Sequence, residues 1–253
     1  MSEAKVYIVT GSASGVGAAT ALRLARRGDR VVVNCSKSVA EAESVAAQCV
    51  EAGGDAIAVR ADVAQDDACR RLAAAALDRW GRIDGLVNNA GTTKFAAMRD
   101  LSLLSAEDFH NIYAVNTIGA YQMVRACEAP LRAAGGAVVN VSSIASYQGL
   151  ASSIAYAASK GALNAMTICL ARALGPAVRV NAVLPGFIES RWLREGFGAQ
   201  VYEQVRAAYR AQAALDAVLT TDDVAAAIVF LLDAEKLTGQ LLTVDAGKGI
   251  GRA

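Results

Sequence analysis

The sequence has only one histidine, His110, among its 253 residues. A single imidazole cannot form a histidine cluster that binds a metal, and a Ser-His-Asp triad would have to use His110 itself. The five cysteines are an odd number without a C-x-x-C pair, so neither a disulfide framework nor a zinc site is indicated. We therefore predict no metal site and expect buried thiols. His110 belongs to no recognisable motif, and we expect it on the surface or in an interface.

The sequence also has no excess of charge, because 25 lysines and arginines face 24 aspartates and glutamates, a formal net charge of +1. Such a balance gives no basic field that would hold nucleic acid or an anionic membrane surface. The longest uninterrupted apolar run, Val224 to Leu232, is far shorter than the roughly 20 residues that span a bilayer. The first residues contain no apolar segment long enough for a signal peptide. We expect a cytoplasmic protein without a nucleic-acid or membrane partner.

Aromatic residues make up only 6% of the chain while apolar residues reach 54%, so much of the core is built from small side chains. Short β-branched runs alternate with alanine-rich stretches of helical period. We predict strands at 6–9, 31–34, 56–60, 85–88, 137–142, 179–183 and 241–244. We predict helices at 17–27, 39–52, 66–80, 108–133, 153–174 and 222–232.

Some of these strands, such as 31–33 and 138–139, are continuously apolar, which is typical of parallel strands covered by helices on both faces. Right-handed crossovers then give an α/β fold with a doubly wound, seven-stranded parallel sheet of the Rossmann type. No repeat, charge block or linker divides the chain, so we expect one domain over residues 1–253. The three prolines lie near the ends of predicted elements.

The segment from about residue 187 to 219 interrupts this alternation and contains a large share of the aromatic residues. Two interpretations fit this composition. One is a lid or an insertion beside a substrate pocket, and the other is the plain packing of a helical pair.

A glycine-rich turn follows the first predicted strand and precedes a helix; it reads Thr10-Gly11-Ser12-Ala13-Ser14-Gly15-Val16-Gly17. Glycines in such a turn let backbone N–H groups approach a pyrophosphate at the positive end of the helix. No Gly-Lys-Ser/Thr follows, which argues against a P-loop kinase or ATPase. A turn that merely connects strand and helix is the alternative. We predict that a dinucleotide is bound by Gly11, Ser14, Gly15, Val16 and Gly17.

Further motifs follow the later strands. They are Asp62-Val63, Asn88-Asn89-Ala90-Gly91, Asn116, Ser143, Tyr156-x-x-x-Lys160 and Pro185-Gly186. With the glycine turn, their order and spacing resemble the short-chain dehydrogenase/reductase family in its single-domain form, over nearly the whole chain. Within that family the general pattern is most similar to 3-oxoacyl-(acyl-carrier-protein) reductases, and many sugar, steroid and xenobiotic reductases share it.

Tyr156 and Lys160 are four residues apart, so a helix places both on one face and brings the ammonium near the phenol. The cation is expected to lower the pKa of the phenol from about 10 toward a range useful for proton transfer. An isolated Y-x-x-x-K pair would more often be a solvated pair on a helix surface.

The resemblance implies specific roles for these residues. Tyr156 would be the general acid during carbonyl reduction, and Lys160 would also hold the nicotinamide ribose. Ser143 would donate a hydrogen bond to the substrate oxygen; Ser142 is chemically equivalent, and the family's spacing selects Ser143. Asn116 would support a water-linked proton relay behind Lys160, with a packing contact as the alternative.

The resemblance also implies the remaining cofactor contacts. Asp62, with Val63 beside it, would contact the adenine amine. Asn89, Ala90 and Gly91 would line the adenosine ribose and brace the central strands, although these residue types also favour turns. The nicotinamide carboxamide would be flanked by Pro185, Gly186 and the backbone of Ile188, and Ser190 would contact the carboxamide or the pyrophosphate.

The end of the second strand distinguishes the two nicotinamide cofactors. An acidic residue there accepts hydrogen bonds from the ribose hydroxyls of NAD and repels a 2′-phosphate. Cys35 stands at this position, and no carboxylate follows before Glu41. Lys37, with Ser36 beside it, is suited to a 2′-phosphate, so we predict NADP(H) rather than NAD(H). A solvated loop charge is the alternative for Lys37.

The sequence thus favours an NADP(H)-dependent oxidoreductase that acts on a small carbonyl or secondary alcohol substrate. A catalytically silent cofactor-binding sensor or scaffold is the alternative, and a methyltransferase would leave Ser143, Tyr156 and Lys160 unexplained together. The family is typically a homotetramer, paired through helices 108–133 and 153–174 and through the last helix and strand. An acyl carrier protein would need a basic patch; the candidates are Arg125, Arg132 and Arg172, which scattered surface charge explains equally well.

Overall fold

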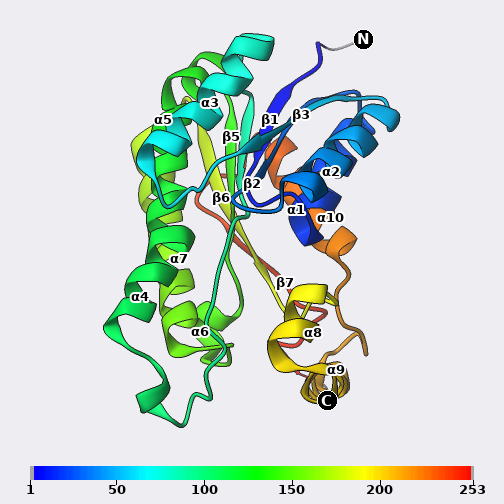
Figure 1. The fold of residues 1–253 in the computed structure, drawn as a ribbon, viewed down its shortest axis with the longest axis vertical. Coiled ribbons are helices and arrows are strands. Elements are labelled where there is room, and N and C mark those ends of the chain that lie inside the picture. Colours follow the sequence, from blue (N-terminus) through cyan, green and yellow to red (C-terminus); the bar gives the residue numbers. More distant parts are fainter. Residues whose placement is uncertain (1–2, 252–253) are drawn as a thin grey trace.

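Seven parallel strands form one sheet through the centre of the molecule (Figure 1), which a computed structural model describes from residue 3 to residue 251. The strand order is β3-β2-β1-β4-β5-β6-β7. The strands are β1 (Val6–Val9), β2 (Arg30–Cys35), β3 (Asp55–Arg60), β4 (Gly85–Asn88), β5 (Ala137–Val141), β6 (Arg179–Pro185) and β7 (Leu241–Val244). All neighbouring pairs are parallel, so the predicted doubly wound seven-stranded sheet is confirmed.

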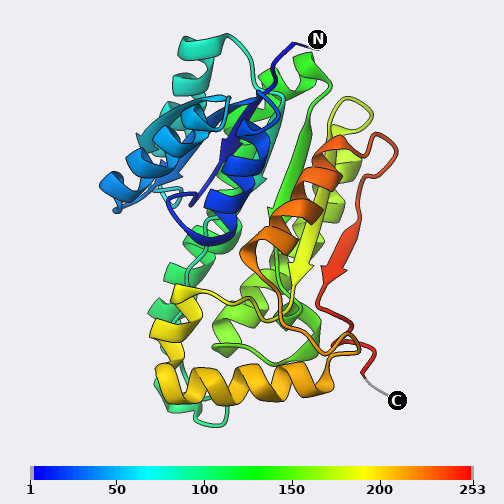
Figure 2. The same ribbon diagram turned by 90° about the vertical axis from the view of Figure 1, so that its right-hand side faces the viewer.

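Helices cover both faces of this sheet (Figures 1 and 2). One face carries α1 (Gly15–Ala25), α2 (Val39–Glu51) and α10 (Thr221–Asp233). The other carries α3 (Asp66–Trp80), α5 (Ala120–Ala134) and α7 (Ile154–Leu174), and α4 (Ala106–Tyr113) packs beside α7. The short elements are the 3₁₀ turn η1 (Leu101–Leu103) and α6 (Ala145–Gln148).

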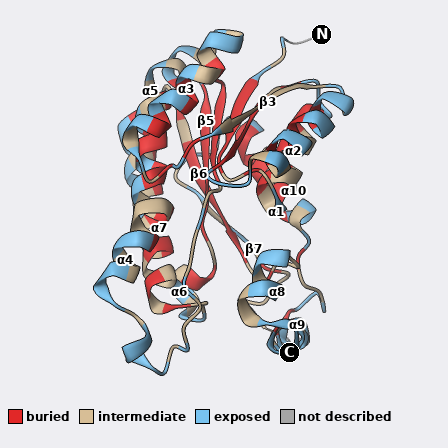
Figure 3. Ribbon diagram, viewed as in Figure 1, coloured by how far each residue is buried: buried red, intermediate tan, exposed pale blue. Residues whose placement is uncertain are grey.

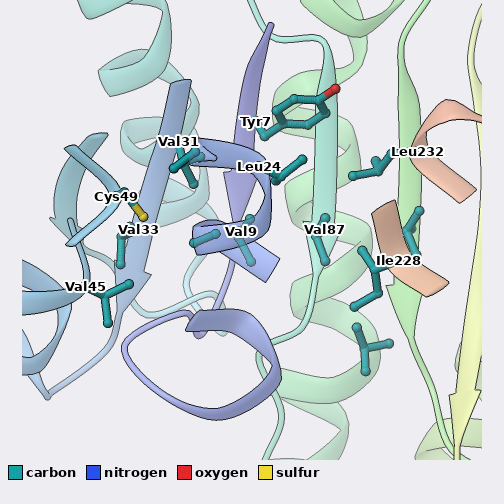
Figure 4. Packing of buried hydrophobic residues seen from close by; sticks show 14 of the residues in the cluster. Tyr7, Val9, Leu24, Val31, Val33, Val45, Cys49, Val87, Ile228 and Leu232 are labelled. Atoms are coloured by element: carbon teal, nitrogen blue, oxygen red, sulfur yellow. The ribbon is translucent and has the colours of Figure 1, made fainter. Parts of the chain in front are cut away.

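Two apolar clusters fill the space between the sheet and its helix layers, and burial is concentrated there (Figure 3). In β1, Tyr7 and Val9 belong to the cluster under α1 and α10 (Figure 4), while Val6 and Ile8 belong to the opposite cluster. Successive side chains of a strand point to opposite faces, so each strand must be apolar at every position when both faces are covered. This is the physical reason for the continuously apolar strands.

The helix predicted at 108–133 is three segments in the structure. A capping box between Ser105 and Asp108 starts α4, the π-helical segment η2 (Ala114–Gly119) follows, and α5 completes the tract. The predicted helical tract is therefore present, but its π turn was not predicted, because a π turn adds one residue per turn without changing the composition. Pro130 lies inside α5, which corrects the expectation that the prolines fall near element ends.

The segment after β6 folds into the helical pair α8 (Arg191–Phe197) and α9 (Ala199–Gln212). The pair lies beyond the carboxyl ends of β6 and β7 (Figure 2). It is anchored by a small apolar cluster in which the ring of Phe187 lies 5.4 Å from that of Tyr202 and 5.9 Å from that of Tyr209. These three aromatic residues therefore have a packing role at the end of the sheet.

Four of the five thiols are buried, but Cys169 on α7 is exposed, which corrects the expectation for that residue. His110 is exposed on α4, as expected. Within residues 3–251, no helix is both long enough and apolar enough to cross a membrane. The same described range contains no group of three or more His, Cys, Asp or Glu side chains arranged to hold a metal ion.

Candidate active site

A large cleft opens at the carboxyl ends of the central strands and has a volume of about 1260 Å³. It lies where β1 has β2 on one side and β4 on the other, the point at which the strand order reverses. Loops after β1 and β4 diverge at such a point, and open α/β sheets bind their ligands there. The cleft runs from Lys37 and Asp62, after β2 and β3, to Trp192 and Phe197 in α8.

The glycine turn forms one wall of the cleft. Gly11 and Gly15 adopt left-handed backbone angles, with φ of 61° and 60°. A Cβ on Gly17 would lie 2.6 Å from Asn89 Nδ2 and 2.7 Å from Ser12 Cα, so no side chain fits there, whereas a Cβ on Gly15 would meet nothing within 4 Å. The side chain of Ser14 does not cap α1 in the described structure, which leaves the first N–H groups of the helix available to an anion. This geometry fits a dinucleotide pyrophosphate.

Two buried polar side chains, which the sequence analysis did not single out, hold the glycine turn in place. Asn34 Oδ1 accepts a hydrogen bond from Gly11 N at 3.0 Å, and Asn34 Nδ2 donates to the carbonyls of Val59 and Ala61. Thr10 Oγ1 accepts from the backbone N–H groups of Asn89 and Ala90, both at 3.0 Å. A polar residue inside an apolar strand, such as Asn34, is the sequence signal that could have revealed this function.

Asn89 also braces the central strands, because its Nδ2 donates to the carbonyls of Thr10 and Gly11, both at 2.9 Å. Asp62 is exposed at the cleft, and its Oδ1 accepts from Ala64 N at 3.0 Å. Val63, Ala90 and Gly91 line the same cleft. Asp62 and Asn89 therefore form hydrogen bonds within and between turns, and they also line the cleft.

At the end of β2, the side chain of Cys35 is buried, whereas Ser36 and Lys37 are exposed and line the cleft. Arg60, the residue opposite Cys35 in β3, donates a hydrogen bond from Nε to the carbonyl of Ser36 at 3.3 Å. Glu41, the first carboxylate of the segment, pairs with Arg191 at 3.1 Å. This end of the cleft therefore has positive charge and no carboxylate from the β2 loop.

Pro185, Gly186, Ile188 and Ser190 line the cleft between the sheet and α8. A Cβ on Gly186 would lie 1.8 Å from the hydroxyl oxygen of Tyr209, so glycine is required where α9 packs on the end of β6. Ser190 caps α8, because its Oγ accepts from Leu193 N at 3.3 Å.

Tyr156 and Lys160 lie on one face of α7, as predicted, with Lys160 Nζ 5.6 Å from the centre of the Tyr156 ring. Lys160 is only 3% exposed, and its Nζ donates to the carbonyl of Val141 at 2.7 Å. Ser153 Oγ accepts from Tyr156 N at 3.2 Å and caps α7. The backbone of Tyr156 is therefore held at the start of the helix, and the ammonium of Lys160 is held by the end of β5.

Burial governs the ionisation of both groups. It raises the pKa of Tyr156 to about 12, a rise that a hydrogen bond with Ser143 opposes, and it lowers the pKa of Lys160 to about 8. The pKa of the phenol is therefore raised where a lowering was expected, and Lys160 is not among the causes of the shift. The physical reason is that removing the phenolate from water costs more free energy than the hydrogen bond with Ser143 returns.

The structure separates the two candidate serines. The hydroxyl of Ser142 is buried and donates to the carbonyl of Lys160 at 3.2 Å. Ser143 is less buried, and its hydroxyl interacts with Tyr156. Ser143 is therefore the serine placed beside the phenol.

Asn116 lies in the π-helical segment η2 and is 1% exposed. Its Oδ1 accepts from Thr92 N at 2.8 Å, and its Nδ2 donates to Thr92 O and to Ser159 Oγ, both at 3.0 Å. Asn116 thus joins the loop after β4 to α7 one residue from Lys160. These hydrogen bonds hold the loop and the helix together. The π turn that carries Asn116 is of a kind that recurs at functional sites.

A cluster of aromatic rings that the sequence analysis did not predict borders the far end of the cleft. Phe95 contacts Trp192 and Phe197, with ring centres 5.9 and 5.0 Å apart, and Trp192 lies 6.2 Å from the Tyr156 ring. The cluster joins the loop after β4 to α8. Residues far apart in the sequence give no local signal for such a contact.

Known proteins share this architecture. The family model described as Enoyl-(Acyl carrier protein) reductase matches residues 11–248. A Streptomyces violaceoruber protein named as ketoacyl reductase 2 of the granaticin polyketide synthase is 45% identical over 97% of this chain and 96% of its own. The 3-oxoacyl-(acyl-carrier-protein) reductase of Synechocystis sp. is 34% identical over 96% of each chain. A solved short-chain dehydrogenase/reductase structure from Burkholderia xenovorans is 38% identical and has a TM-score of 0.91, covering 99% of this chain and 100% of that chain.

The fold and the cleft define an oxidoreductase built on a dinucleotide-binding sheet. The chain belongs to the short-chain dehydrogenase/reductase family.

Proposed function

We propose that the protein is an NADP(H)-dependent reductase of ketones or 3-oxoacyl thioesters, with oxidation of secondary alcohols as the reverse reaction. The observation that carries the proposal is that Ser143, Tyr156 and Lys160 line the same cleft as the open glycine turn. When bound, the nicotinamide supplies or accepts the hydride. The protein supplies the binding site, the orientation and the proton.

The cofactor would be held along the length of the cleft. The first turn of α1, with Gly11, Ser14, Gly15, Val16 and Gly17, would take the pyrophosphate. The adenosine end would meet Asp62, Val63 and the segment 89–91. Pro185, Gly186, Ile188 and Ser190 would line the nicotinamide end, with Lys160 at the ribose.

Proton transfer to the substrate oxygen would come from the phenol of Tyr156. A phenol whose pKa is about 12 is protonated at neutral pH, which is the form that a general acid needs. Ser143 would donate a second hydrogen bond to the same oxygen and stabilise its developing charge. Asn116 would act as a positioning residue, because it holds the loop after β4 against α7 beside Lys160.

The preference for NADP(H) is supported by the charge at the end of β2. Lys37 and the Ser36 hydroxyl face the cleft where an acidic residue would select NAD(H). Arg60 adds a second cation next to the Ser36 carbonyl. Guanidinium and ammonium groups are the usual partners of a phosphate dianion.

A carbonyl substrate is supported by the names of several relatives, which are ketoacyl and versicolorin reductases. The first test is therefore spectrophotometric: NADPH and NADH oxidation is followed against a panel of ketones and 3-oxoacyl thioesters. We expect turnover with NADPH, and we expect Tyr156→Phe to remove at least about 99% of it while the Kd for NADPH stays close to the wild-type value.

Tight NADPH binding without turnover of any carbonyl would contradict the proposal and favour the silent sensor or scaffold. Turnover by Tyr156→Phe at the wild-type rate would contradict only the proton-donor role.

We further propose a cytoplasmic homotetramer. Exposed apolar side chains lie on the two faces expected to pair: Tyr121 on α5 and Ile168 on α7 on one face, and Phe230 on α10 on the other. Arg125 pairs with Asp66, and Arg132 pairs with Glu128. Two of the three arginines considered as a basic patch for an acyl carrier protein are therefore already paired with carboxylates of this chain. The partner that we propose is a small-molecule substrate.

A further inference from the structure

Lys248 lies in the tail that follows β7 and lines the cleft close to the substrate end. Its side chain is partly buried. The sequence motifs of the family do not include it, and nothing in the proposed proton transfer uses it.

The turn that carries Lys248 is fixed by a buried carboxylate. Asp245 is 8% exposed, and its two oxygens accept from Gly247 N at 2.9 Å and Gly249 N at 2.7 Å. The backbone N–H of Lys248 donates to the carbonyl of Asp245 at 3.0 Å, and the hydroxyl of Tyr209 in α9 donates to the same carbonyl at 2.7 Å. The turn is therefore held against α9, and the position of Lys248 is set by the fold.

The charges along the cleft single out this residue. The charged side chains of its lining are Lys37, Asp62, Lys160 and Lys248. The first two lie at the ends of β2 and β3, and Lys160 is bonded to the carbonyl of Val141. Between the catalytic tyrosine and the helical pair α8 and α9, Lys248 is the one charged side chain among the lining residues from the described part of the chain.

The buried carboxylate of Asp245 in the same turn is engaged by the backbone N–H groups of Gly247 and Gly249 and forms no ion pair with Lys248. No carboxylate of residues 3–251 forms an ion pair with Lys248, whereas all four arginine side chains on α8 and α9 are paired with glutamates or aspartates. Other residues that line the cleft are apolar, such as Met98, Leu150, Trp192 and Phe197, or neutral and polar, such as Gln148 and Gln212. A partly buried cation among such groups gains most from an anion supplied by a ligand.

We propose that Lys248 binds an anionic group of the substrate, a carboxylate or a phosphate, so that charged ketones are preferred over neutral ones. This inference rests on the proposed reductase function and deepens it, because it names the substrate class. The aromatic rings of Trp192 and Phe197 would hold the apolar body of the same molecule.

The experiment compares matched substrates. For a carboxylate, kcat/KM is measured for 4-acetylbenzoate and for its methyl ester; for a phosphate, it is measured for acetoacetyl-4′-phosphopantetheine and for acetoacetyl-pantetheine. We expect the wild-type enzyme to prefer the charged member of at least one pair by about tenfold or more. Lys248→Met should remove this preference, and Lys248→Arg should retain it. Lys236→Met is the matched control, because Lys236 is an exposed lysine outside the cleft.

A preference that is equal in the wild type and in Lys248→Met overturns the inference, as does a loss of NADPH affinity in Lys248→Met without a change in preference. Calorimetric titration of the keto acid and its ester, with the oxidised cofactor present, separates binding from turnover. Binding of the acid that depends on Lys248, in an enzyme that reduces no ketone, would contradict the proposed function and support the anion site. Equal binding of acid and ester would contradict the anion site alone.

Discussion

The phenol of Tyr156 and the ammonium of Lys160 respond to the same burial in opposite directions. A charged phenolate is disfavoured by burial, so the pKa of Tyr156 rises, while a charged ammonium is also disfavoured, so the pKa of Lys160 falls to about 8. At neutral pH both groups hold their protons. The site is therefore prepared to donate a proton, which fits the direction of carbonyl reduction.

At the residue scale, Lys37 is the sharpest test of the cofactor preference. Lys37→Asp removes the cation proposed to meet a 2′-phosphate and introduces a carboxylate that repels it. We expect the ratio of kcat/KM for NADPH to that for NADH to fall by about 100-fold, since charge-assisted hydrogen bonds contribute roughly 1.5–3 kcal/mol. Steady-state kinetics with both cofactors provides the measurement.

Lys236→Asp, the same change at an exposed lysine outside the cleft, should leave this ratio unaltered. A wild-type enzyme that uses NADH as efficiently as NADPH would show that Lys37 is a solvated loop charge.

At the scale of elements, the glycine turn and α1 act together because the helix begins directly against the loop after β4. Gly17 brings the first turn of α1 close to Asn89 and Ser12. Asn34 and Thr10 then fasten the turn to β3 and to the loop after β4. The proposed pyrophosphate site thus depends on contacts among α1, β2, β3 and the loop after β4, although its sequence motif is a single run of residues.

Gly17→Ala tests this close approach. The added Cβ would collide with backbone and amide atoms at 2.6 to 2.7 Å, and overpacking of this kind costs about 1–3 kcal/mol. We expect the Tm to fall by a few degrees and the Kd for NADPH to rise about tenfold, measured by thermal denaturation and fluorescence titration.

The control is Gly81→Ala at the end of α3. Gly81 has φ of 74° and lies outside the cleft, and a Cβ added to it would meet no atom within 4 Å. The substitution should lower the Tm through backbone strain while the Kd for NADPH stays the same. An unchanged Kd in Gly17→Ala would contradict the assignment of this turn to the pyrophosphate.

At the scale of the whole molecule, the outer helices leave apolar side chains in contact with solvent. Ile168 is 41% exposed on α7, and Phe230 is 54% exposed on α10. The two residues lie on opposite faces of the sheet, because α7 and α10 belong to different helix layers (Figure 1). Two independent self-contacts would produce the tetramer that the family resemblance implies.

Light scattering coupled to gel filtration should therefore give four times the mass of one chain. Ile168→Glu and Phe230→Glu should each reduce this to a dimer, because burying an unpaired carboxylate disrupts one interface and leaves the other. Val50→Glu is the control, since Val50 is 51% exposed on α2, a helix that belongs to neither of the two proposed interfaces. A wild-type monomer would refute the proposed assembly.

The fold was accessible from the sequence because each strand and helix carries its own periodic signal. The apolar strands at 31–33 and 138–139 and the helices that follow them predicted the sheet correctly. The π turn at Asn116 and the proline inside α5 were missed, since neither changes the apolar pattern. In the site, residues within motifs were predicted and Trp192 lay in the segment proposed for a substrate pocket, whereas the roles of Asn34 and Lys248 were not predicted, because each depends on a contact with a distant segment.

The sequence by itself determined the family, the parallel sheet and the residues available for proton transfer, because these depend on local periodicity and on motifs of fixed spacing. Only the tertiary structure showed that the hydroxyl of Ser142 is buried, reversed the expected direction of the Tyr156 pKa, and placed Lys248 at the cleft. Burial and the approach of distant segments set these properties. Neither can be read from the order of residues along the chain.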